Sequence, residues 1–185
     1  MSDLTRRTFM LHGAATAAGA LGAAALGEAR ADDEPAPGGS APIDELRVGA
    51  SGCGGRGSDR ALNALHADPS VRIVALADLF GDRLETARRN LSEHGGSRGE
   101  VSPERCFAGF DAYRQLLDVD LDIVILATPP GFRPAHFQAV IERGRHAFIE
   151  KPVAVCPAGV RQVRAAAELA DRRDLKVLAG TQRRP

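Results

Sequence analysis

A glycine-rich turn that directly follows a short apolar run limits the folds open to this chain more than any other pattern in it. The run that begins at Leu46 leads into Gly52-x-Gly54-x-x-Gly57, and a polar segment compatible with a helix follows. In a dinucleotide-binding turn the first glycine permits the tight turn, the second lets the backbone approach a pyrophosphate, and the third allows close packing of helix on sheet. The helix would direct its free N–H groups and the positive end of its dipole at the phosphates. The spacing alone fits a flexible loop equally well.

The residues after this turn favour dinucleotide binding over a plain loop. An apolar run from Val71 to Ala77 predicts a second strand, and it ends in Asp78. This acid lies roughly 20 residues beyond the last glycine, where a carboxylate can accept hydrogen bonds from the adenosine ribose hydroxyls. An ordinary loop acid after a strand is the alternative. The carboxylate would also repel a 2′-phosphate, so we expect NAD rather than NADP as the cofactor.

The composition argues against several classes of function. Lys plus Arg equals Asp plus Glu at 24 each, so no basic field points to a nucleic-acid partner, and the lack of Trp weakens any base-stacking role. The three cysteines, Cys53, Cys106 and Cys156, are widely spaced and form no C-x-x-C pair. We therefore expect no metal site and interpret the cysteines as small, mostly buried residues.

The N-terminal segment has the pattern of an export signal rather than of a folded element. Arg6 and Arg7 form a twin-arginine pair, residues 11–26 are weakly apolar and rich in alanine, and Ala29-Arg30-Ala31 is a candidate cleavage site. The apolar stretch is too short for a stable transmembrane helix, so we expect no stable membrane anchor. Residues 1–31 are predicted to be a twin-arginine signal peptide that exports the protein to the periplasm. An uncleaved N-terminus is the alternative.

Strands and helices alternate along the rest of the chain. Residues 32–44 are rich in Pro, Gly and acid, which predicts a disordered linker before one domain over residues 45–185. Apolar runs predict further strands at 104–107, 121–127, 146–149 and 176–180, and a surface loop is expected at 92–102. Helical spacing predicts helices near 61–65, 82–91, 134–143 and 160–170, the last burying Val160, Val163, Ala167 and Ala170, with a brief helix after Asp111. This order predicts an α/β fold, a doubly wound and mostly parallel Rossmann sheet.

Two further strand ends make the pattern more specific. Ala127-Thr128-Pro129 ends the fourth predicted strand, and Glu150-Lys151-Pro152 ends the fifth. Together with the glycine turn and Asp78, these motifs resemble the Gfo/Idh/MocA family of oxidoreductases over about residues 46–184. The twin-arginine leader and the Gly-Cys-Gly-Gly-Arg-Gly form of the turn resemble its exported bacterial members.

The resemblance implies a fold, a reaction and a set of site residues. Members pair an N-terminal Rossmann domain with a C-terminal α/β domain and move a hydride between NAD(P) and a CH–OH carbon, usually on a sugar or polyol. By resemblance, the residues of the turn would hold the pyrophosphate, namely Gly52, Cys53, Gly54, Gly55, Arg56 and Gly57. Asp78 would bind the adenosine ribose, and Thr128 and Pro129 would lie beside the nicotinamide half. Glu150 and Lys151 would lie at the nicotinamide ribose and the substrate.

Lys151 is the candidate catalytic residue. An ammonium beside the reacting carbon can hydrogen-bond the substrate oxygen and stabilise developing alkoxide charge. A surface lysine at a strand end is the alternative, but the carboxyl end of a parallel strand, followed by proline, favours the catalytic role. We also expect the Lys151–Pro152 peptide bond to be cis.

The chain departs from the family pattern at two places. Many relatives place a histidine shortly after Thr-Pro, whereas Arg133 stands here and is expected to favour an anionic substrate. His136 is expected to be a solvated or packed residue with no catalytic role. The chain also ends at Pro185, so we expect a truncated product that lacks the family's second domain, exposes apolar sheet surface and does little chemistry alone.

Whether this chain alone is an enzyme is therefore open, and three interpretations remain. The first is the NAD(P)-binding domain of a sugar or polyol oxidoreductase, which could form a homo-oligomer. The second is a non-catalytic dinucleotide-binding module or one half of a split protein. The third is a structural remnant that binds nothing.

Overall fold

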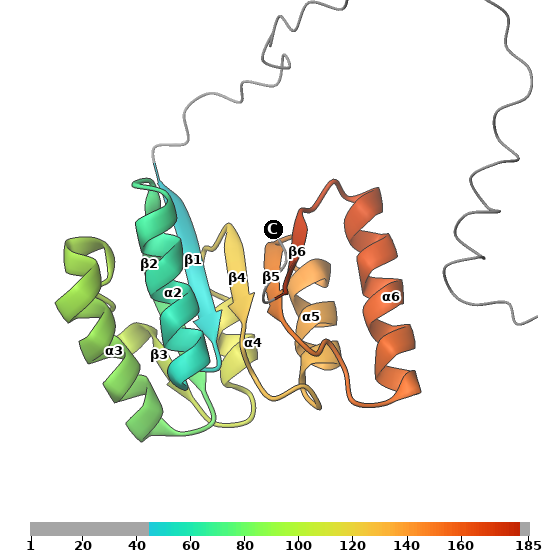
Figure 1. Ribbon diagram of the computed structural model, residues 1–185, viewed down its shortest axis with the longest axis horizontal. Helices are drawn as coiled ribbons and strands as arrows, with labels where there is room; N and C mark the ends of the chain where they lie inside the picture. Colours follow the sequence, from blue (N-terminus) through green and yellow to red (C-terminus); the bar gives the residue numbers. More distant parts are fainter. Residues whose placement is uncertain (1–44, 182–185) are drawn as a thin grey trace, which may run out of the picture. The chain divides into compact units, whose positions relative to one another are not determined.

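The computed structural model describes residues 45–181, and its centre is a six-stranded sheet in the order β3-β2-β1-β4-β5-β6. Every neighbouring pair of strands is parallel (Figure 1). The strands are β1 Leu46–Ser51, β2 Val71–Asp78, β3 Cys106–Ala108, β4 Ile123–Leu126, β5 His146–Glu150 and β6 Val177–Gly180. The predicted doubly wound α/β fold is confirmed.

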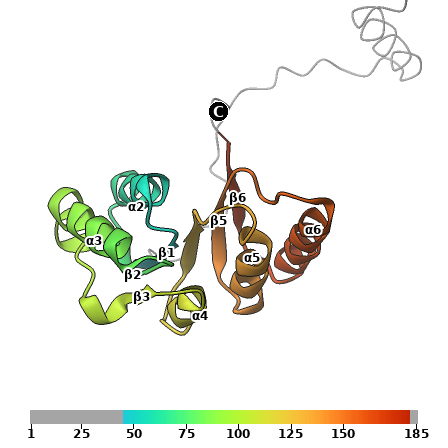
Figure 2. The same cartoon turned by 90° about the horizontal axis from the view of Figure 1, so that it is seen from below.

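Helices cover both faces of the sheet (Figure 2). They are α2 Gly55–Ala67, α3 Gly81–Gly95, α4 Ala112–Leu117, α5 Arg133–Glu142 and α6 Pro157–Arg172, with short 3₁₀ turns at Gly96–Arg98 and Pro103–Arg105. α2 and α3 pack on one face, and α4, α5 and α6 pack on the other. This arrangement is what alternating strand and helix patterns produce when each crossover returns to a parallel strand.

Two apolar cores lie on the two sides of the sheet, because successive strand residues point to opposite faces. In β4, Val124 and Leu126 belong to the core under α4, α5 and α6, whereas Ile125 belongs to the core under α2 and α3. Leu65 of α2 and Phe137 of α5 are both 1% exposed. Full burial of such a side chain stabilises the fold by roughly 1.5–3 kcal/mol.

Several element boundaries and one helix face differ from expectation. α3 runs on to Gly95, so the first residues of the expected loop at 92–102 are helical, and β3 and β4 are shorter than predicted. In α6, Val160 is 45% exposed, and the buried residues are Gly159, Ala166 and Ala170. A Cβ on Gly159 would lie 3.0 Å from Cγ of Pro134, so α5 and α6 approach too closely for a larger residue there. Apolar spacing does not reveal a glycine as the buried position.

The amino ends of β1 and β4 are joined by an ion-pair cluster. Nε and Nη2 of Arg47 donate to the two carboxylate oxygens of Asp122 at 3.1 and 2.9 Å, and Arg47 also contacts Asp120. The hydrogen bond from Arg47 holds the pKa of Asp122 below its usual value. Nη1 of Arg145 lies 3.8 Å from Asp120. A bidentate arginine–carboxylate pair of this kind fixes geometry as well as charge.

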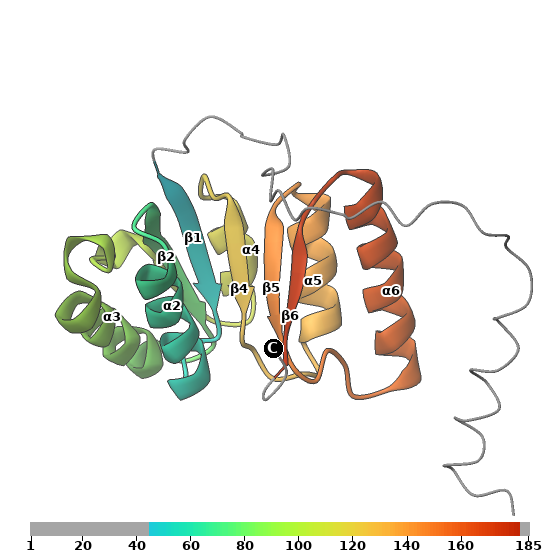
Figure 3. The same ribbon diagram turned by 45° about the horizontal axis from the view of Figure 1, so that its top comes forward.

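One part of a sheet face is not covered by any helix of the described residues, 45–181. β5 and β6 pack against α5 and α6 on one face, but the face beside α2 is open, as Figure 3 shows. A groove of about 690 Å³ lies there, lined by apolar side chains that include Val48, Ile125, Phe148 and Leu178. Leu178 is 65% exposed. The expected apolar surface is therefore present.

The predicted signal peptide (1–31) and linker (32–44) lie outside the described residues, and both stay predictions. Within residues 45–181, no helix combines the length and the apolar character needed to cross a membrane.

Candidate functional site

The candidate site lies where the order of strands reverses, between β1 and β4. All strands are parallel, so their carboxyl ends meet at one edge of the sheet, and ligands of such folds bind outside that edge at the reversal point. Ser51 pairs with Leu126, which brings the turns after β1 and β4 side by side. β2 and β5 flank this pair and end in Asp78 and Glu150. The four strand ends predicted to carry function are thus neighbours.

Two glycines of the turn have no room for a side chain. Gly52 has a φ of +92°, and a Cβ there would lie 2.5 Å from the backbone nitrogen of Thr128. A Cβ on Gly57 would lie 1.7 Å from the carbonyl oxygen of Gly52. Gly52 therefore makes the tight turn and Gly57 lets α2 pack directly on it, which confirms both predicted roles.

The other two glycines face open space. A Cβ on Gly54 or Gly55 would meet no atom within 4 Å. α2 begins at Gly55, and no side chain among the described residues caps its N-terminus. Free N–H groups and the positive end of the helix dipole beside an open backbone are the features that bind a diphosphate. The residues present therefore fit a dinucleotide, with Arg56 exposed in the first turn of α2.

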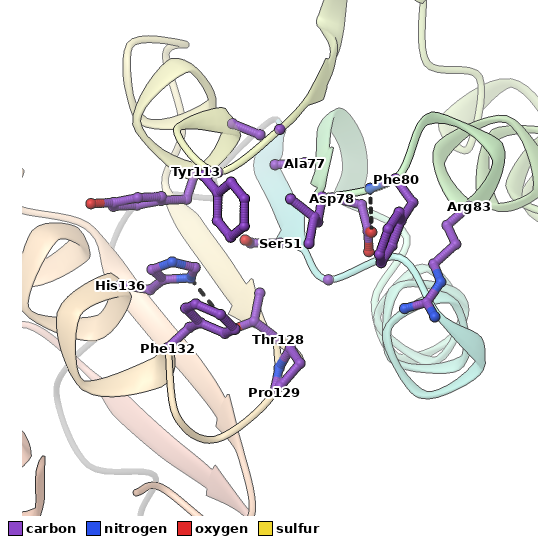
Figure 4. Close-up of a pocket in the computed structure, with 15 residues that line it drawn as sticks. Ser51, Ala77, Asp78, Phe80, Arg83, Tyr113, Thr128, Pro129, Phe132 and His136 are labelled. Atoms are coloured by element: carbon purple, nitrogen blue, oxygen red, sulfur yellow. Dashed lines mark hydrogen bonds between the residues drawn. The ribbon is translucent and has the colours of Figure 1, made fainter.

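Asp78 ties the turn to β2. Its Oδ2 accepts a hydrogen bond from the backbone N–H of Cys53 at 2.6 Å. Its Oδ1 accepts one from the backbone N–H of Phe80 at 3.0 Å, which Figure 4 shows. The side chain is 8% exposed and borders a cavity of about 90 Å³. Each carboxylate oxygen can accept a second bond, so a ribose hydroxyl could still be bound.

The cavity extends from Asp78 to the turn after β4. Thr128, Pro129 and Phe132 line the part of the cavity next to that turn, and the predicted place of Thr128 and Pro129 beside the nicotinamide stays a prediction. On the near side, the guanidinium of Arg83 lies 4.9 Å from the ring centre of Phe80. Figure 4 shows Phe80, Arg83 and Phe132 around the cavity, and no role was predicted from the sequence for any of them. All three residues follow closely in sequence after the ends of β2 or β4, and this position could have indicated that they lie near the site.

His136 also lines this cavity. Its ring stacks on Tyr113 with the ring centres 4.0 Å apart, and Nδ1 lies 3.4 Å from Oγ1 of Thr128. Burial lowers the pKa of His136 to about 4. The imidazole is therefore neutral near pH 7. The ring is packed, as one of the two expected alternatives required, and the lack of a catalytic role stays a prediction.

Glu150 and Lys151 differ sharply in exposure. Glu150 is 1% exposed, and its Oε1 accepts a hydrogen bond from Nε of Arg60 at 2.5 Å. Burial raises the pKa of Glu150, but the bond and charge of Arg60 outweigh this and hold the pKa below its usual value. Lys151 is exposed, and the bond between Lys151 and Pro152 is cis, as predicted. The role of Glu150 at the nicotinamide ribose stays a prediction.

Arg133 does not have the position expected of a substrate-binding residue. It is only 5% exposed, and Nη1 donates to the carbonyl oxygens of Glu150 at 2.7 Å and of Pro152 at 2.5 Å. The expectation that Arg133 favours an anionic substrate is therefore wrong. The run of residues after Thr128 suggested a place near the site, but not that the side chain turns inward.

The remaining features considered from the sequence are the cysteines and the possibility of a metal site. Cys53 is buried, and burial raises the pKa of its thiol well above the usual value, whereas Cys156 is exposed, contrary to expectation. Within residues 45–181, no three or more His, Cys, Asp and Glu side chains are arranged to hold a metal ion.

Comparison with known proteins gives one family and several longer relatives. Residues 46–181 match the family described as "Oxidoreductase family, NAD-binding Rossmann fold". A glycosyl hydrolase family 109 protein of Streptomyces coelicolor is 36% identical over 110 residues, which cover 59% of this chain and 22% of that protein. Glycosyl hydrolase family 109 protein 2 of Shewanella sp. ANA-3 is 32% identical over 163 residues, covering 83% of this chain and 35% of the relative. The chain thus spans about a third or less of these relatives.

The solved structures that share the fold include two with a bound nicotinamide cofactor. The scyllo-inositol dehydrogenase of Lactobacillus casei, with bound NAD(H) and scyllo-inositol, has a TM-score of 0.58 at 19% identity, covering 74% of this chain and 36% of its own. KijD10, a 3-ketoreductase from Actinomadura kijaniata in complex with NADP and TDP-benzene, has a TM-score of 0.55 at 26% identity, covering 74% and 37%.

Proposed function

The chain belongs to the Gfo/Idh/MocA oxidoreductases as their NAD-binding Rossmann domain, and on this basis we propose that it binds NAD for hydride transfer with a sugar- or polyol-like substrate. The observation that carries the proposal is the open backbone at Gly54 and Gly55, where a Cβ would meet nothing within 4 Å, at an uncapped helix N-terminus. The nicotinamide ring supplies or accepts the hydride when the cofactor is bound.

Each side chain at the reversal point has a proposed part. The N–H groups at the start of α2 bind the diphosphate, and Asp78 accepts hydrogen bonds from the adenosine ribose. Thr128 and Pro129 lie beside the nicotinamide half. Lys151 donates a hydrogen bond to the substrate oxygen and stabilises its negative charge. Only two of the 24 basic residues are lysines, Lys151 and Lys176, so a lysine at this strand end stands out against an arginine-rich chain.

We propose NAD rather than NADP as the cofactor. The carboxylate of Asp78 would repel a 2′-phosphate, and the adjoining cleft at the start of α2 and α3 contains Asp59 and Asp82 as well as Arg83. One relative was solved with NAD(H) and another with NADP, so the choice depends on the residues of this chain. Fluorescence titration should give a dissociation constant at least about tenfold lower for NADH than for NADPH.

A glycine variant tests the diphosphate site. Gly54→Ala should keep the fold, because its Cβ meets nothing, but weaken NADH binding about tenfold or more by occupying the space that a diphosphate needs. Gly81→Ala is the matched control, since a Cβ there also meets no atom within 4 Å and lies in another helix. If the unaltered chain binds neither nucleotide, the proposal fails and the structural-remnant interpretation gains support.

The relatives' names raise a second candidate activity. Both relatives described above are called glycosyl hydrolases, and some glycoside hydrolases depend on NAD. The second candidate is therefore that this domain binds NAD for the cleavage of a glycosidic bond with the help of hydride transfer. Aryl glycoside hydrolysis that requires NAD⁺ would favour this candidate, whereas net NADH formation from a polyol would favour the dehydrogenase. Cofactor binding with neither activity would favour a non-catalytic module or a split protein.

We also propose export to the periplasm through the twin-arginine pathway. The support is the sequence pattern of residues 1–31 alone. Replacing Arg6 and Arg7 together by lysine should retain the protein in the cytoplasm of a host with this pathway. Equal periplasmic amounts of both forms would contradict the proposal.

A further inference from the structure

The turn that carries Lys151 is fixed by two arginines from helices on opposite faces of the sheet. From α2, Nε of Arg60 donates to the carboxylate of Glu150 at 2.5 Å. From the first residue of α5, Nη1 of Arg133 donates to the carbonyl oxygens of Glu150 at 2.7 Å and Pro152 at 2.5 Å. These two carbonyls belong to the residues on either side of Lys151. Arg133 therefore bridges the backbone on the two sides of the lysine.

Arg133 is a buried arginine without a carboxylate partner among the described residues, which is unusual. It is 5% exposed, and no carboxylate among residues 45–181 lies within ion-pair distance of it. Its Nε has no hydrogen-bond partner, and burial lowers the pKa of the guanidinium. A buried charge without an ion pair destabilises a fold unless hydrogen bonds compensate for its lost hydration. The bonds to the two carbonyls supply this compensation, since hydrogen bonds from charged donors are stronger than those between neutral groups.

The geometry points to Arg133 as a positioning residue that sets the direction in which the Lys151 side chain leaves the turn. This role rests on the proposed function of Lys151 at the substrate oxygen. A reacting group must be held closely, because a misplacement of about 1 Å can lower a rate by about 100-fold. Lys151 is itself exposed, so its own packing cannot hold it, and the backbone beneath it must.

The chain contains a matched control for this arrangement. Nη1 of Arg173 donates to the carbonyl oxygens of Ile141 and Glu142 at 2.9 and 3.0 Å, at the opposite end of α5. Arg173→Met therefore removes the same kind of bridge as Arg133→Met, but far along the helix from Lys151. A general loosening of α5 would follow from both variants. Loss of lysine positioning should follow from only one.

The two lysines make Lys151 easy to observe in the full chain. Labelling with lysine that carries ¹³C at Cε gives one signal each for Lys151 and Lys176, and Lys176→Arg assigns them. In the unaltered protein, saturating NAD⁺ should shift the Lys151 signal and leave that of Lys176 in place. In Arg133→Met the NAD⁺-induced shift should fall by more than half, whereas the dissociation constant should rise less than about threefold because the diphosphate site is intact. Arg133→Lys should restore part of the shift, and Arg173→Met should behave like the unaltered protein.

The outcomes separate this inference from the proposed function. An unchanged Lys151 shift in Arg133→Met, or an equal loss in Arg173→Met, overturns the positioning role. NAD⁺ binding without any Lys151 shift in the unaltered protein removes the role of Lys151 and the positioning role with it. If NAD⁺ does not bind at all, the proposed function fails, and the ¹³C relaxation of free Lys151 decides whether Arg133 orders the turn: it must change in Arg133→Met and not in Arg173→Met. If circular dichroism shows Arg133→Met to be unfolded, Arg133→Gln, which keeps an amide donor, is judged by the same measurements.

Discussion

At the scale of single residues, Gly57 is the tightest constraint in the site. Its Cβ position lies 1.7 Å from the carbonyl oxygen of Gly52, and backbone cannot swing away as a side chain can. Gly57→Ala should therefore destabilise the fold by about 3 kcal/mol or more. Gly55→Ala, in the same helix, meets no atom and should stabilise by about 0.5–1 kcal/mol, because alanine favours helix. Urea unfolding measures both, and a similar midpoint for the two variants would contradict the close packing of α2 on the turn.

His136 should make stability depend on pH in a defined window. Burial lowers its pKa to about 4, whereas the unperturbed value is 6.5. Between these values the unfolded chain binds more protons than the folded one, so stability falls as pH drops and levels off below about 4. Protonation of His136 should lower the free energy of unfolding by about 2 kcal/mol. This is less than the full pKa difference would give, because the side chain is partly exposed to solvent.

His136→Phe keeps a ring beside Tyr113 and should remove this part of the pH dependence. His66, exposed in the last turn of α2, provides the control variant His66→Gln. Chemical unfolding at several pH values between 4 and 7 gives the comparison. The same slope in His136→Phe as in the unaltered protein would show that another group titrates.

At the scale of elements, the pair formed by Arg60 and Glu150 joins α2 to the end of β5. Removing one partner of a buried pair leaves an uncompensated charge, so Arg60→Met should destabilise by about 3 kcal/mol near pH 7. In the unaltered protein the pKa of Glu150 is held low, so its stabilising effect is present above the usual pKa and lost as pH falls through the lowered one. The difference between the two proteins should therefore shrink in acid.

An exposed pair supplies the comparison for this element-scale prediction. Arg88 and Glu85 lie 2.9 Å apart on the surface of α3. Arg88→Met should change the free energy of unfolding by less than about 1 kcal/mol. Equal effects of the two substitutions in thermal or urea unfolding would mean that burial does not decide the strength of the Arg60–Glu150 pair.

The elements that the sequence predicted correctly are those whose signal is local. An apolar run predicted β4, and helical spacing predicted a helix near 82–91, where α3 buries Leu84, Ala87 and Leu91. The face of α6 was partly missed because Gly159 is buried by the approach of Pro134, which is distant in sequence. Arg133 was misinterpreted for the same reason, since its partners, the carbonyls of Glu150 and Pro152, come from another strand end.

At the scale of the whole domain, the open face beside β6 should bind apolar probes. Leu178 is 65% exposed next to a groove of about 690 Å³, and exposed apolar patches of this kind attract hydrophobic dyes and promote association. Leu178→Lys should lower the fluorescence of an added hydrophobic dye and reduce self-association, measured by light scattering. NADH binding should be unchanged, because the groove is on a sheet face and the glycine turn is at the carboxyl edge. Val160→Lys, exposed on α6, is the control and should have little effect on the dye.

The ion-pair cluster of Arg47, Asp120 and Asp122 stands at the amino edge of the sheet, a strand length away from the glycine turn. Six residues of β1 separate the two edges, which is about 20 Å and roughly twice the distance over which physiological salt screens a charge. At this distance, charges in the cluster should act only weakly on a bound nucleotide. Variants randomised around Arg47 and selected for thermal stability should therefore all keep the same preference between NAD and NADP.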